Sequence, residues 1–433
     1  MPPFQPLRVS PNGRFLVRGE RPFFWLGDTA WQLFQRLTFS EAWQYFQNRA
    51  EKGFTVIQAV GLCELDGLGT PNANGACPLF DRDPTQPNPA YWAHVDALIR
   101  MANEMGLVMA FLPTWGNHWH SPSDGIFTEA NAFTYGAWLG TRYRDADIVW
   151  VLGGDRAPED ETHRNIIRAM AAGLRKGDNS SHLQTFHTNG RNGSARYFHG
   201  EDWLDFNMRQ NGHGVDFGPG CGQTATDYLQ SPAKPVLDGE PIYEDIPIEF
   251  DIRNGFATAH QVRNALFWNL FSGAFGHTYG HNSIWQMWST DRAPVLNPLM
   301  PWNEALDRPG AAQMQHARWL LESRPFLSRI PDQDLLLENP GGQVAARDET
   351  GSYAMFYSPG NESISVNFGE LHASHFIAWH FDPITGIAHR LDSFSNPGQR
   401  TFPAPTGATD WILVLDDAAR NFCIPGARMS EKS

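Results

Sequence analysis

Short apolar runs alternate with helix-length amphipathic stretches along most of this chain, and this alternation restricts its fold more than any other feature. The stretches with apolar residues at helical spacing are Phe39–Lys52, Tyr91–Met105, Glu161–Arg175 and Ala257–Phe271. The strand-like runs are Phe23–Leu26, Thr55–Val60, Leu107–Leu112, Ile148–Leu152, Leu183–His187, Phe206–Arg209, Pro235–Leu237 and Phe275–Tyr279. Strand and helix alternating about eight times predict a (β/α)8 TIM barrel. Ser40 is the expected N-cap of the first of these helices.

The main alternative is an open doubly wound sheet, which typically carries a glycine-rich phosphate-binding turn after its first strand. Here the first strand runs into Leu26–Trp31, which reads Leu-Gly-Asp-Thr-Ala-Trp and offers no such turn. The barrel is therefore the favoured architecture.

Two further regions have an antiparallel pattern. Leu7 to Pro22 reads as a hairpin around a Pro-Asn-Gly turn at Pro11. After Arg324-Pro325 the apolar runs become short and are separated by Gly, Pro, Asn and Asp, which is typical of a small β-sandwich. We expect a catalytic barrel with its hairpin over residues 1–324 and a β-sandwich over 325–433.

Composition narrows the partners. The net charge is −14, from 33 basic and 47 acidic residues, which argues against nucleic acid and anionic membranes as partners. The chain has 16 tryptophans, whose flat apolar faces suit sugar rings although most are expected in the core. The four cysteines show no metal-type spacing, and Cys63 and Cys77 are expected as free thiols rather than as a bridge.

The N-terminus and the longest apolar runs bear on location. Met1–Pro6 has neither a basic start nor an apolar run typical of a signal peptide. No run reaches the roughly 18 apolar residues of a membrane span. We expect a cytoplasmic protein, or a secreted one whose signal has been removed.

Two carboxylates follow glycines at strand ends, where barrel enzymes keep catalytic groups. Asp155 ends the run Val149–Asp155 after the fourth strand, and Glu240 follows Gly239 after the seventh. Two such acids are the minimum that a glycosidase needs, one to protonate the leaving oxygen and one to attack or to activate water. The pattern predicts a glycoside hydrolase acting on a carbohydrate and needing no metal or organic cofactor. In the structural alternative, Asp155 caps the next helix and Glu240 pairs with an arginine.

Other residues compete for these roles. Glu244 lies four residues past Glu240 and is a second candidate nucleophile. Histidines at predicted strand ends leave a metal-dependent barrel hydrolase as a further alternative. Its candidate ligands are His118, His120, His187 and His213. The His-x-His at His118 follows the third strand rather than the first, and the eighth strand brings no acid, so the two-carboxylate prediction is preferred.

Polar and aromatic side chains of the strand-end loops are candidates for the sugar pocket. For Asp28 an N-cap role is weighed evenly against binding of a hydroxyl pair. The candidates are Asp28, Trp31, Asn117, His118, His187, Gln210, Tyr279 and Trp285.

Several of these segments occur together in one known family. In this combination and order the chain resembles the apiosidase family of glycoside hydrolases, family 140. The barrel segments are Phe24–Trp31, Trp150–Asp155, Gly239–Pro241 and His277–Gly280; those of the tail are Trp379–Gly386 and Asp410–Leu415.

The resemblance implies a retaining exo-glycosidase that releases β-linked apiose from pectic side chains or plant glycosides. It assigns Asp155 as acid/base and Glu240 as nucleophile, in agreement with the strand-end argument. Another furanoside remains an alternative substrate. The tail resembles a small domain once labelled collagen-binding, for which we expect instead a structural role against the barrel.

Overall fold

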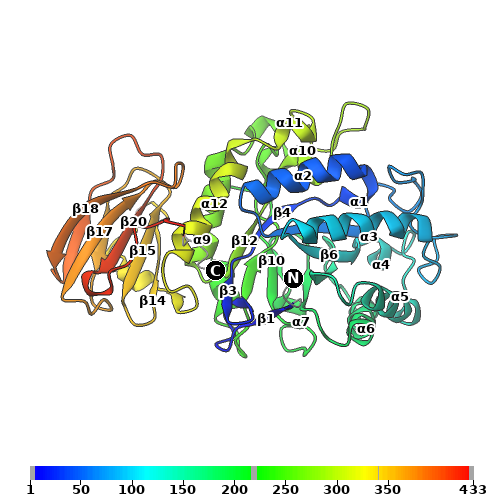
Figure 1. Ribbon diagram of the computed structural model, residues 1–433, viewed down its shortest axis with the longest axis horizontal. Coiled ribbons are helices and arrows are strands. Elements are labelled where there is room, and N and C mark those ends of the chain that lie inside the picture. Colours follow the sequence, from blue (N-terminus) through cyan, green and yellow to red (C-terminus); the bar gives the residue numbers. More distant parts are fainter. Residues whose placement is uncertain (1–4, 216–221, 340, 429–433) are drawn as a thin grey trace.

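The computed structural model describes residues 5–215, 222–339 and 341–428, and it forms a barrel with a β-domain at its side (Figure 1). The main sheet has the order β8-β7-β6-β5-β4-β12-β11-β10-β9, parallel except where the short β9 (Asn192–Gly193) meets β10. The parallel strands are β4 (Leu26–Thr29), β5 (Val56–Leu62), β6 (Val108–Thr114), β7 (Ile148–Gly153), β8 (Gln184–His187), β10 (Asn207–Gln210), β11 (Val236–Asp238) and β12 (Gly276–Tyr279).

The two ends of this sheet approach each other at β8 and β10. The amide N–H of Asp205 donates to the Gln184 carbonyl at 2.8 Å, and Thr185 Oγ1 donates to the Phe206 carbonyl at 2.7 Å. The sheet is thus a nearly closed barrel, and the predicted TIM-barrel class is confirmed.

Helices surround the barrel, and four of the long ones lie where the sequence predicts them, at residues 39–51, 89–104, 161–178 and 259–271. The long ones are α2 (Phe39–Glu51), α3 (Pro89–Glu104), α5 (Glu129–Arg142), α6 (Glu161–Asp178), α9 (Ala259–Phe271) and α12 (Pro309–Glu322). The short ones are α1 (Leu33–Arg36), α4 (Asn117–His120), α7 (Ala195–Phe198), α8 (Gly222–Tyr228), α10 (Asn282–Trp285), α11 (Trp302–Ala305), η1 (Ile248–Phe250) and η2 (Ile252–Asn254). Two more, η3 (Gln333–Leu335) and η4 (Ala418–Arg420), lie against strands of the C-terminal domain. Within the described ranges no helix combines the length and apolarity of a membrane span.

The start of α2 differs from the expected one. Its N-cap is Thr38, whose side chain accepts from the Glu41 amide while Glu41 accepts from the Thr38 amide at 2.8 Å. Ser40 was the wrong choice, because this reciprocal capping box satisfies two free amides at once.

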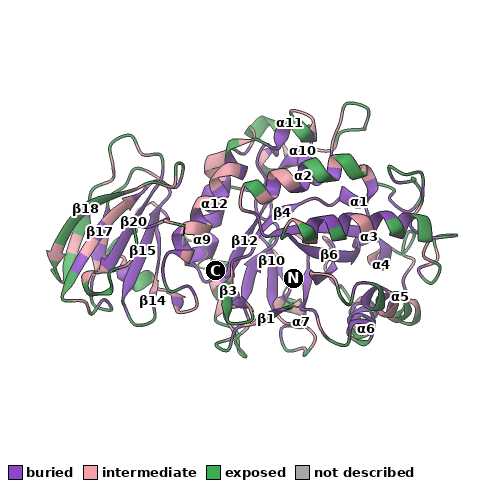
Figure 2. Cartoon of the chain, in the orientation of Figure 1, coloured by how far each residue is buried: buried purple, intermediate pink, exposed green. Residues whose placement is uncertain are grey.

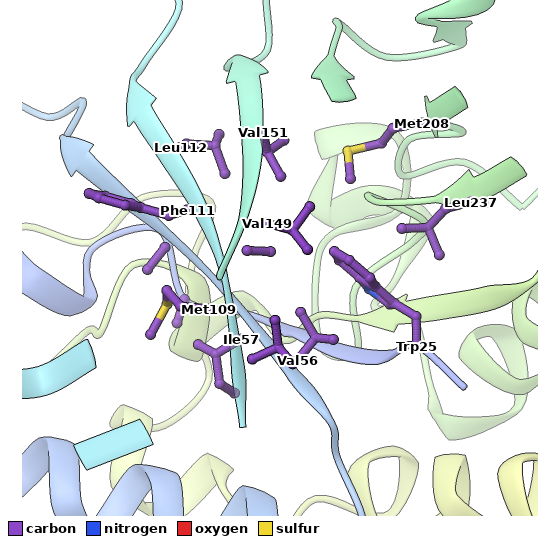
Figure 3. Packing of buried hydrophobic residues seen from close by; sticks show 14 of the residues in the cluster. Trp25, Val56, Ile57, Met109, Phe111, Leu112, Val149, Val151, Met208 and Leu237 are labelled. Carbon is purple, nitrogen blue, oxygen red and sulfur yellow. The ribbon is translucent and has the colours of Figure 1, made fainter. Parts of the chain in front are cut away.

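The barrel interior is apolar and tightly filled. All positions of β5, β6 and β7 are buried, as expected for parallel strands covered by helices on one side and packed inside on the other (Figure 2). Figure 3 shows Val56, Val149 and Leu237, from three different strands, gathered around Trp25. Close packing of this kind fixes the strand ends that carry the site.

The N-terminal hairpin is confirmed and gains a third strand. β1 (Leu7–Val9), β2 (Leu16–Arg18) and β3 (Arg21–Phe23) form an antiparallel sheet. Of the cysteines, Cys63, Cys77 and Cys423 are free thiols, and Cys221 lies outside the described residues.

The C-terminal domain is an antiparallel β-sandwich, as expected, and Arg324-Pro325 lies between α12 and its first strand. One layer has the order β13 (Arg329–Pro331), β14 (Val344–Asp348), β15 (Tyr353–Ser358), β20 (Trp411–Asp417), β17 (His375–Phe381) and β18 (Ala388–Ser395). The second layer consists of β16 (Ile364–Asn367) and β19 (Gln399–Phe402).

The central strands β14, β15 and β20 of the six-stranded layer are buried on both faces, whereas the edge strand β18 is largely exposed. Along β15, Tyr353, Met355 and Tyr357 belong to the same apolar core as the barrel, whereas Ala354 and Phe356 belong to a second core beneath β16 and β19. Successive residues of a strand point to opposite faces, so this alternation records two different neighbours. Helices α9 and α12 lie between this layer and the barrel strands (Figure 1).

A buried ion pair joins the two parts of the chain. Arg263 on α9 donates to both carboxylate oxygens of Asp410, at 2.9 and 2.7 Å, and neither side chain is more than 4% exposed. We expect Arg263→Ala to lower the free energy of unfolding by about 3–5 kcal/mol, because the Asp410 carboxylate would stay buried without its partner. Denaturant titration would measure this loss. The exposed Arg390→Ala serves as control and should change stability by less than about 0.5 kcal/mol.

Candidate active site

A cavity of about 150 Å³ lies at the carboxyl ends of the barrel strands. This is below the range of about 300–1,000 Å³ typical of pockets for drug-sized ligands, so it suits a small ligand. Both predicted catalytic residues line it. The lining residues are Trp31, Glu64, Trp115, Asp155, Gln210, His213, Glu240, Tyr243, Ile246, Phe250, Trp285, Val295 and Leu296.

Asp155 reaches this cavity through an unusual turn. Gly153, Gly154 and Asp155 all have positive φ, at 100°, 98° and 56°. A Cβ on Gly153 would lie 2.2 Å from the His187 carbonyl oxygen, so only glycine fits. The left-handed conformation of Asp155 is a strain that functional sites often retain. Asp155 does not cap the next helix, because the N-cap of α6 is Asp160.

The surroundings of Asp155 favour its protonated form. Burial raises its pKa, and the negative charge of Glu240 raises it further. His187, Arg156 and a hydrogen bond from Gln210 act in the opposite direction without prevailing. Arg156 Nη1 lies 3.0 Å from Asp155 Oδ2, on a side of the pocket where both side chains are about one-third exposed.

Glu240 has the opposite character. Its carboxylate faces His187 Nε2 at 2.9 Å on Oε2 and His213 Nε2 at 3.2 Å on Oε1, and its partners among the described residues include no arginine. Burial alone would raise the pKa of Glu240, but the hydrogen bonds and charges of His187 and His213 outweigh burial and hold this pKa well below its usual range. Glu240 is thus an ionised carboxylate at neutral pH.

His187 links the two acids. The backbone N–H of Asp155 donates to His187 Nδ1 at 3.1 Å, so the ring hydrogen of the neutral tautomer sits on Nε2. Nε2 is the atom that faces Glu240, although the contact is not aligned as an ideal hydrogen bond. One imidazole thereby positions the Gly-Gly-Asp turn against the Glu240 carboxylate.

The structure brings some of the predicted sugar-binding residues together. Trp31, Gln210 and Trp285 line the cavity, and His187 contacts Glu240 at its base. Trp31 and Trp115 lie beside each other with ring centroids 5.3 Å apart, which gives the cavity an aromatic wall.

Two other predicted residues are corrected. The Asp28 carboxylate is fully buried and accepts from Arg49 Nε at 2.5 Å and from the Tyr45 hydroxyl at 2.7 Å. The Tyr279 hydroxyl donates to Glu244 at 2.6 Å in the core. Asp28 and Tyr279 are therefore structural residues outside the cavity lining, and Asp28 is not a helix cap.

The remaining predicted residues also lie away from the cavity lining. His118 is buried with Nε2 3.0 Å from the Cys63 carbonyl oxygen, and Asn117 is half-buried at the start of α4. Glu244, the second candidate nucleophile, is 1% exposed and also accepts from the Gly310 amide at 3.1 Å, so it has no access to a ligand.

The histidines of the metal alternative do not gather into one cluster. His187 and His213 face Glu240, whereas His120 stacks on His163 with ring centroids 4.5 Å apart. In the described part of the chain, no group of three His, Cys, Asp or Glu side chains is arranged to hold a metal ion.

The sequence prediction missed part of the site. Glu64 and Trp115 line the cavity two residues past β5 and one residue past β6, and Tyr243 closes it from the loop after β11. Applying the strand-end rule to the second strand would have found Glu64. His213, a candidate ligand of the metal alternative, contacts the Glu240 carboxylate.

Comparison with protein families places the barrel in a known family. A model described as "Apiosidase-like, catalytic domain" matches residues 10–328, which is most of the chain. The chain belongs to the apiosidase-like family. The β-domain of this apiosidase-like protein matches, over residues 330–416, a model described as "Putative collagen-binding domain of a collagenase".

Solved structures extend the likeness over nearly the whole apiosidase-like chain. One described as "Glycoside hydrolase" is 31% identical, with a TM-score of 0.89 over 97% of this chain and 98% of its own. A glycoside hydrolase family 5 structure from Bacteroides vulgatus ATCC 8482 is 29% identical, with a TM-score of 0.90 over 96% and 95%. A search of curated proteins found no match. The chain is accordingly a glycoside hydrolase, and its substrate is a carbohydrate.

Proposed function

We propose that this enzyme is a retaining exo-glycosidase that releases terminal β-linked apiose from plant glycosides or pectic side chains. The observation that carries the proposal is the opposite tuning of two carboxyls on one cavity, Asp155 with a raised pKa and Glu240 with a lowered one. Environments that push two carboxyl pKa values apart mark an acid and a nucleophile. Membership in the apiosidase-like family supports apiose as the sugar.

In the first step a Glu240 carboxylate oxygen attacks the anomeric carbon, and the bond from that carbon to the leaving oxygen breaks. Asp155 gives its proton to the leaving oxygen, so the aglycone departs as a neutral alcohol. The product is a glycosyl ester on Glu240, and Asp155 is left as a carboxylate.

In the second step a water attacks the same carbon and the ester bond to Glu240 breaks. The Asp155 carboxylate takes the proton of the attacking water and returns to its acid form. Two inversions at the anomeric carbon give net retention. The small size of the cavity supports removal of a single terminal sugar ring.

The test is release of apiose from an apiose-capped flavonoid glycoside, with and without EDTA. We expect equal release in both, and methanol as acceptor should give a methyl glycoside of retained configuration by NMR. Cleavage of another furanoside in place of the apioside would refute apiose as the substrate. Loss of activity with EDTA would favour the metal-dependent alternative.

The pH profile of activity follows from the raised pKa of Asp155 and the lowered pKa of Glu240. The kcat/KM value requires Glu240 ionised and Asp155 protonated. Because the pKa of Glu240 is lowered, activity should persist as pH falls through the usual carboxyl range near about 4. Because the pKa of Asp155 is raised, activity should fall only as pH rises through that raised value. An alkaline limb that stays unchanged in Asp155→Ala, measured on an activated aryl glycoside, would contradict the assignment.

A further inference from the structure

The cavity holds a third carboxyl that the two-step reaction does not use. Glu64 lies two residues past the end of β5 and lines the same cavity as Asp155 and Glu240. It is close enough to both for their negative charges to act on it. Two carboxyls are sufficient for the chemistry, so a third in this position calls for a different role.

Glu64 differs from the other two acids in its contacts. Asp155 is held by Arg156, and Glu240 by two histidines. The Glu64 carboxyl has no hydrogen bond and no ion pair with any residue that the structure describes. Its backbone carbonyl accepts from the Gln32 side chain and from the Gly67 amide. A half-buried carboxyl that is left without a protein partner, on a cavity wall, is available to a ligand.

We propose that Glu64 determines specificity by contacting the substrate: its carboxyl binds a hydroxyl group of the sugar held between Asp155 and Glu240. The inference rests on the proposed glycosidase function and adds a residue that neither the reaction nor the family assignment requires. Sugars carry hydroxyls around the ring, and the aromatic wall of Trp31 and Trp115 leaves polar recognition to groups such as Glu64.

The charge state of Glu64 suits this contact. Burial, and after it the negative charges of Asp155 and Glu240, raise the pKa of Glu64 to about 8, while Arg156 and Arg36 oppose the shift. This upward shift of the pKa favours the protonated form of Glu64 near neutral pH. A neutral carboxyl both donates and accepts, so it can bind one hydroxyl twice or two adjacent hydroxyls once each.

The test pairs enzyme variants with substrates that each lack one hydroxyl. The parent substrate is p-nitrophenyl β-D-apiofuranoside, and its single deoxy analogues are compared on wild type, Glu64→Gln and Glu64→Ala. For one analogue we expect wild type to lose about 10- to 100-fold in kcat/KM, because a group of the site is left unpaired. In Glu64→Ala the same deletion should cost less than about 3-fold, since the two losses are not additive for groups in contact.

The glutamine variant separates contact from folding. Glu64→Gln keeps a neutral donor and acceptor, so its kcat/KM should still fall when the hydroxyl is removed from the substrate. Because glutamine does not titrate, the size of this fall should be the same at pH 6 and at pH 9. Glu159→Gln, an exposed acid in the loop after β7, should leave every ratio unchanged. The proposal would be overturned if, for every hydroxyl, removal of that hydroxyl cost Glu64→Ala as much kcat/KM as it costs the wild type. Glu64 would then be only an electrostatic neighbour of Asp155.

Failure of the proposed function would look different. If the wild type does not cleave the apioside but cleaves p-nitrophenyl α-L-arabinofuranoside, apiose is the wrong sugar. The same comparison of variants on deoxy arabinofuranosides then decides the role of Glu64. A wild type that cleaves neither glycoside contradicts both proposals, because each requires a sugar between Asp155 and Glu240.

Discussion

Glu240→Gln is expected to lower kcat by about 10,000- to 1,000,000-fold on every glycoside, whatever its leaving group. The amide is nearly isosteric with the carboxylate but cannot form the covalent bond to the anomeric carbon. His187 and His213 would remain in place, so the fold around them should be kept. Steady-state kinetics on an aryl glycoside and on an apiose-capped flavonoid would measure the loss.

The matched control is Glu244→Gln, four residues further on. The Glu244 carboxylate accepts from the Tyr279 hydroxyl and from the Gly310 amide. A glutamine side chain has only one acceptor oxygen, so one of these two hydrogen bonds would be lost, at a cost of about 1–3 kcal/mol in the free energy of unfolding. At temperatures at which the Glu244→Gln variant is folded, its kcat should match that of the wild type. If Glu244→Gln were inactive while folded and Glu240→Gln were active, the nucleophile would have to be reassigned.

The second large effect concerns Asp155 and depends on the leaving group. Asp155→Ala should lower kcat/KM by about 100- to 10,000-fold on a flavonoid apioside, whose leaving oxygen needs a proton. On a substrate with a very acidic phenol the loss should be less than about 10-fold, because that oxygen departs without protonation. Azide should then restore turnover and give a glycosyl azide of retained configuration, since azide needs no general base.

Asp160→Asn is the control for this change. Asp160 caps α6 through its side chain, asparagine caps equally well, and the residue does not line the cavity. Its kinetics should match the wild type on both kinds of substrate. An equal loss for Asp155→Ala on good and poor leaving groups would mean that Asp155 is not the acid.

The strands were predictable because their physics is local. Each predicted run of three to six residues ends at a turn, and parallel strands between helices have no polar face to obscure the run. The same logic placed Asp155 after β7 and Glu240 after β11, because the Gly residues before them mark where each strand stops. Both side chains do lie on one cavity.

The direction of other strand-end side chains was not predictable, because a strand buried on both faces gives no polar pattern that tells the two faces apart. All four positions of β4 are buried, so nothing in Leu26–Thr29 tells whether Asp28 faces the cavity or the surrounding helices. Its partner Arg49 comes from α2, 21 residues later. Only the packed structure shows that this carboxylate neutralises a buried arginine, and Tyr279 was misplaced by the same ambiguity.

The burial of both faces of the central strands of the six-stranded layer has a consequence for how this architecture can be inherited. Cut away from α9, the layer would expose Tyr353, Met355 and Tyr357, together with the Asp410 carboxylate that Arg263 now neutralises. Such a fragment would tend to associate with itself rather than bind a distant target. We therefore expect the β-domain to be stable only against its own barrel, so that barrel and β-domain are gained, lost and engineered as one unit.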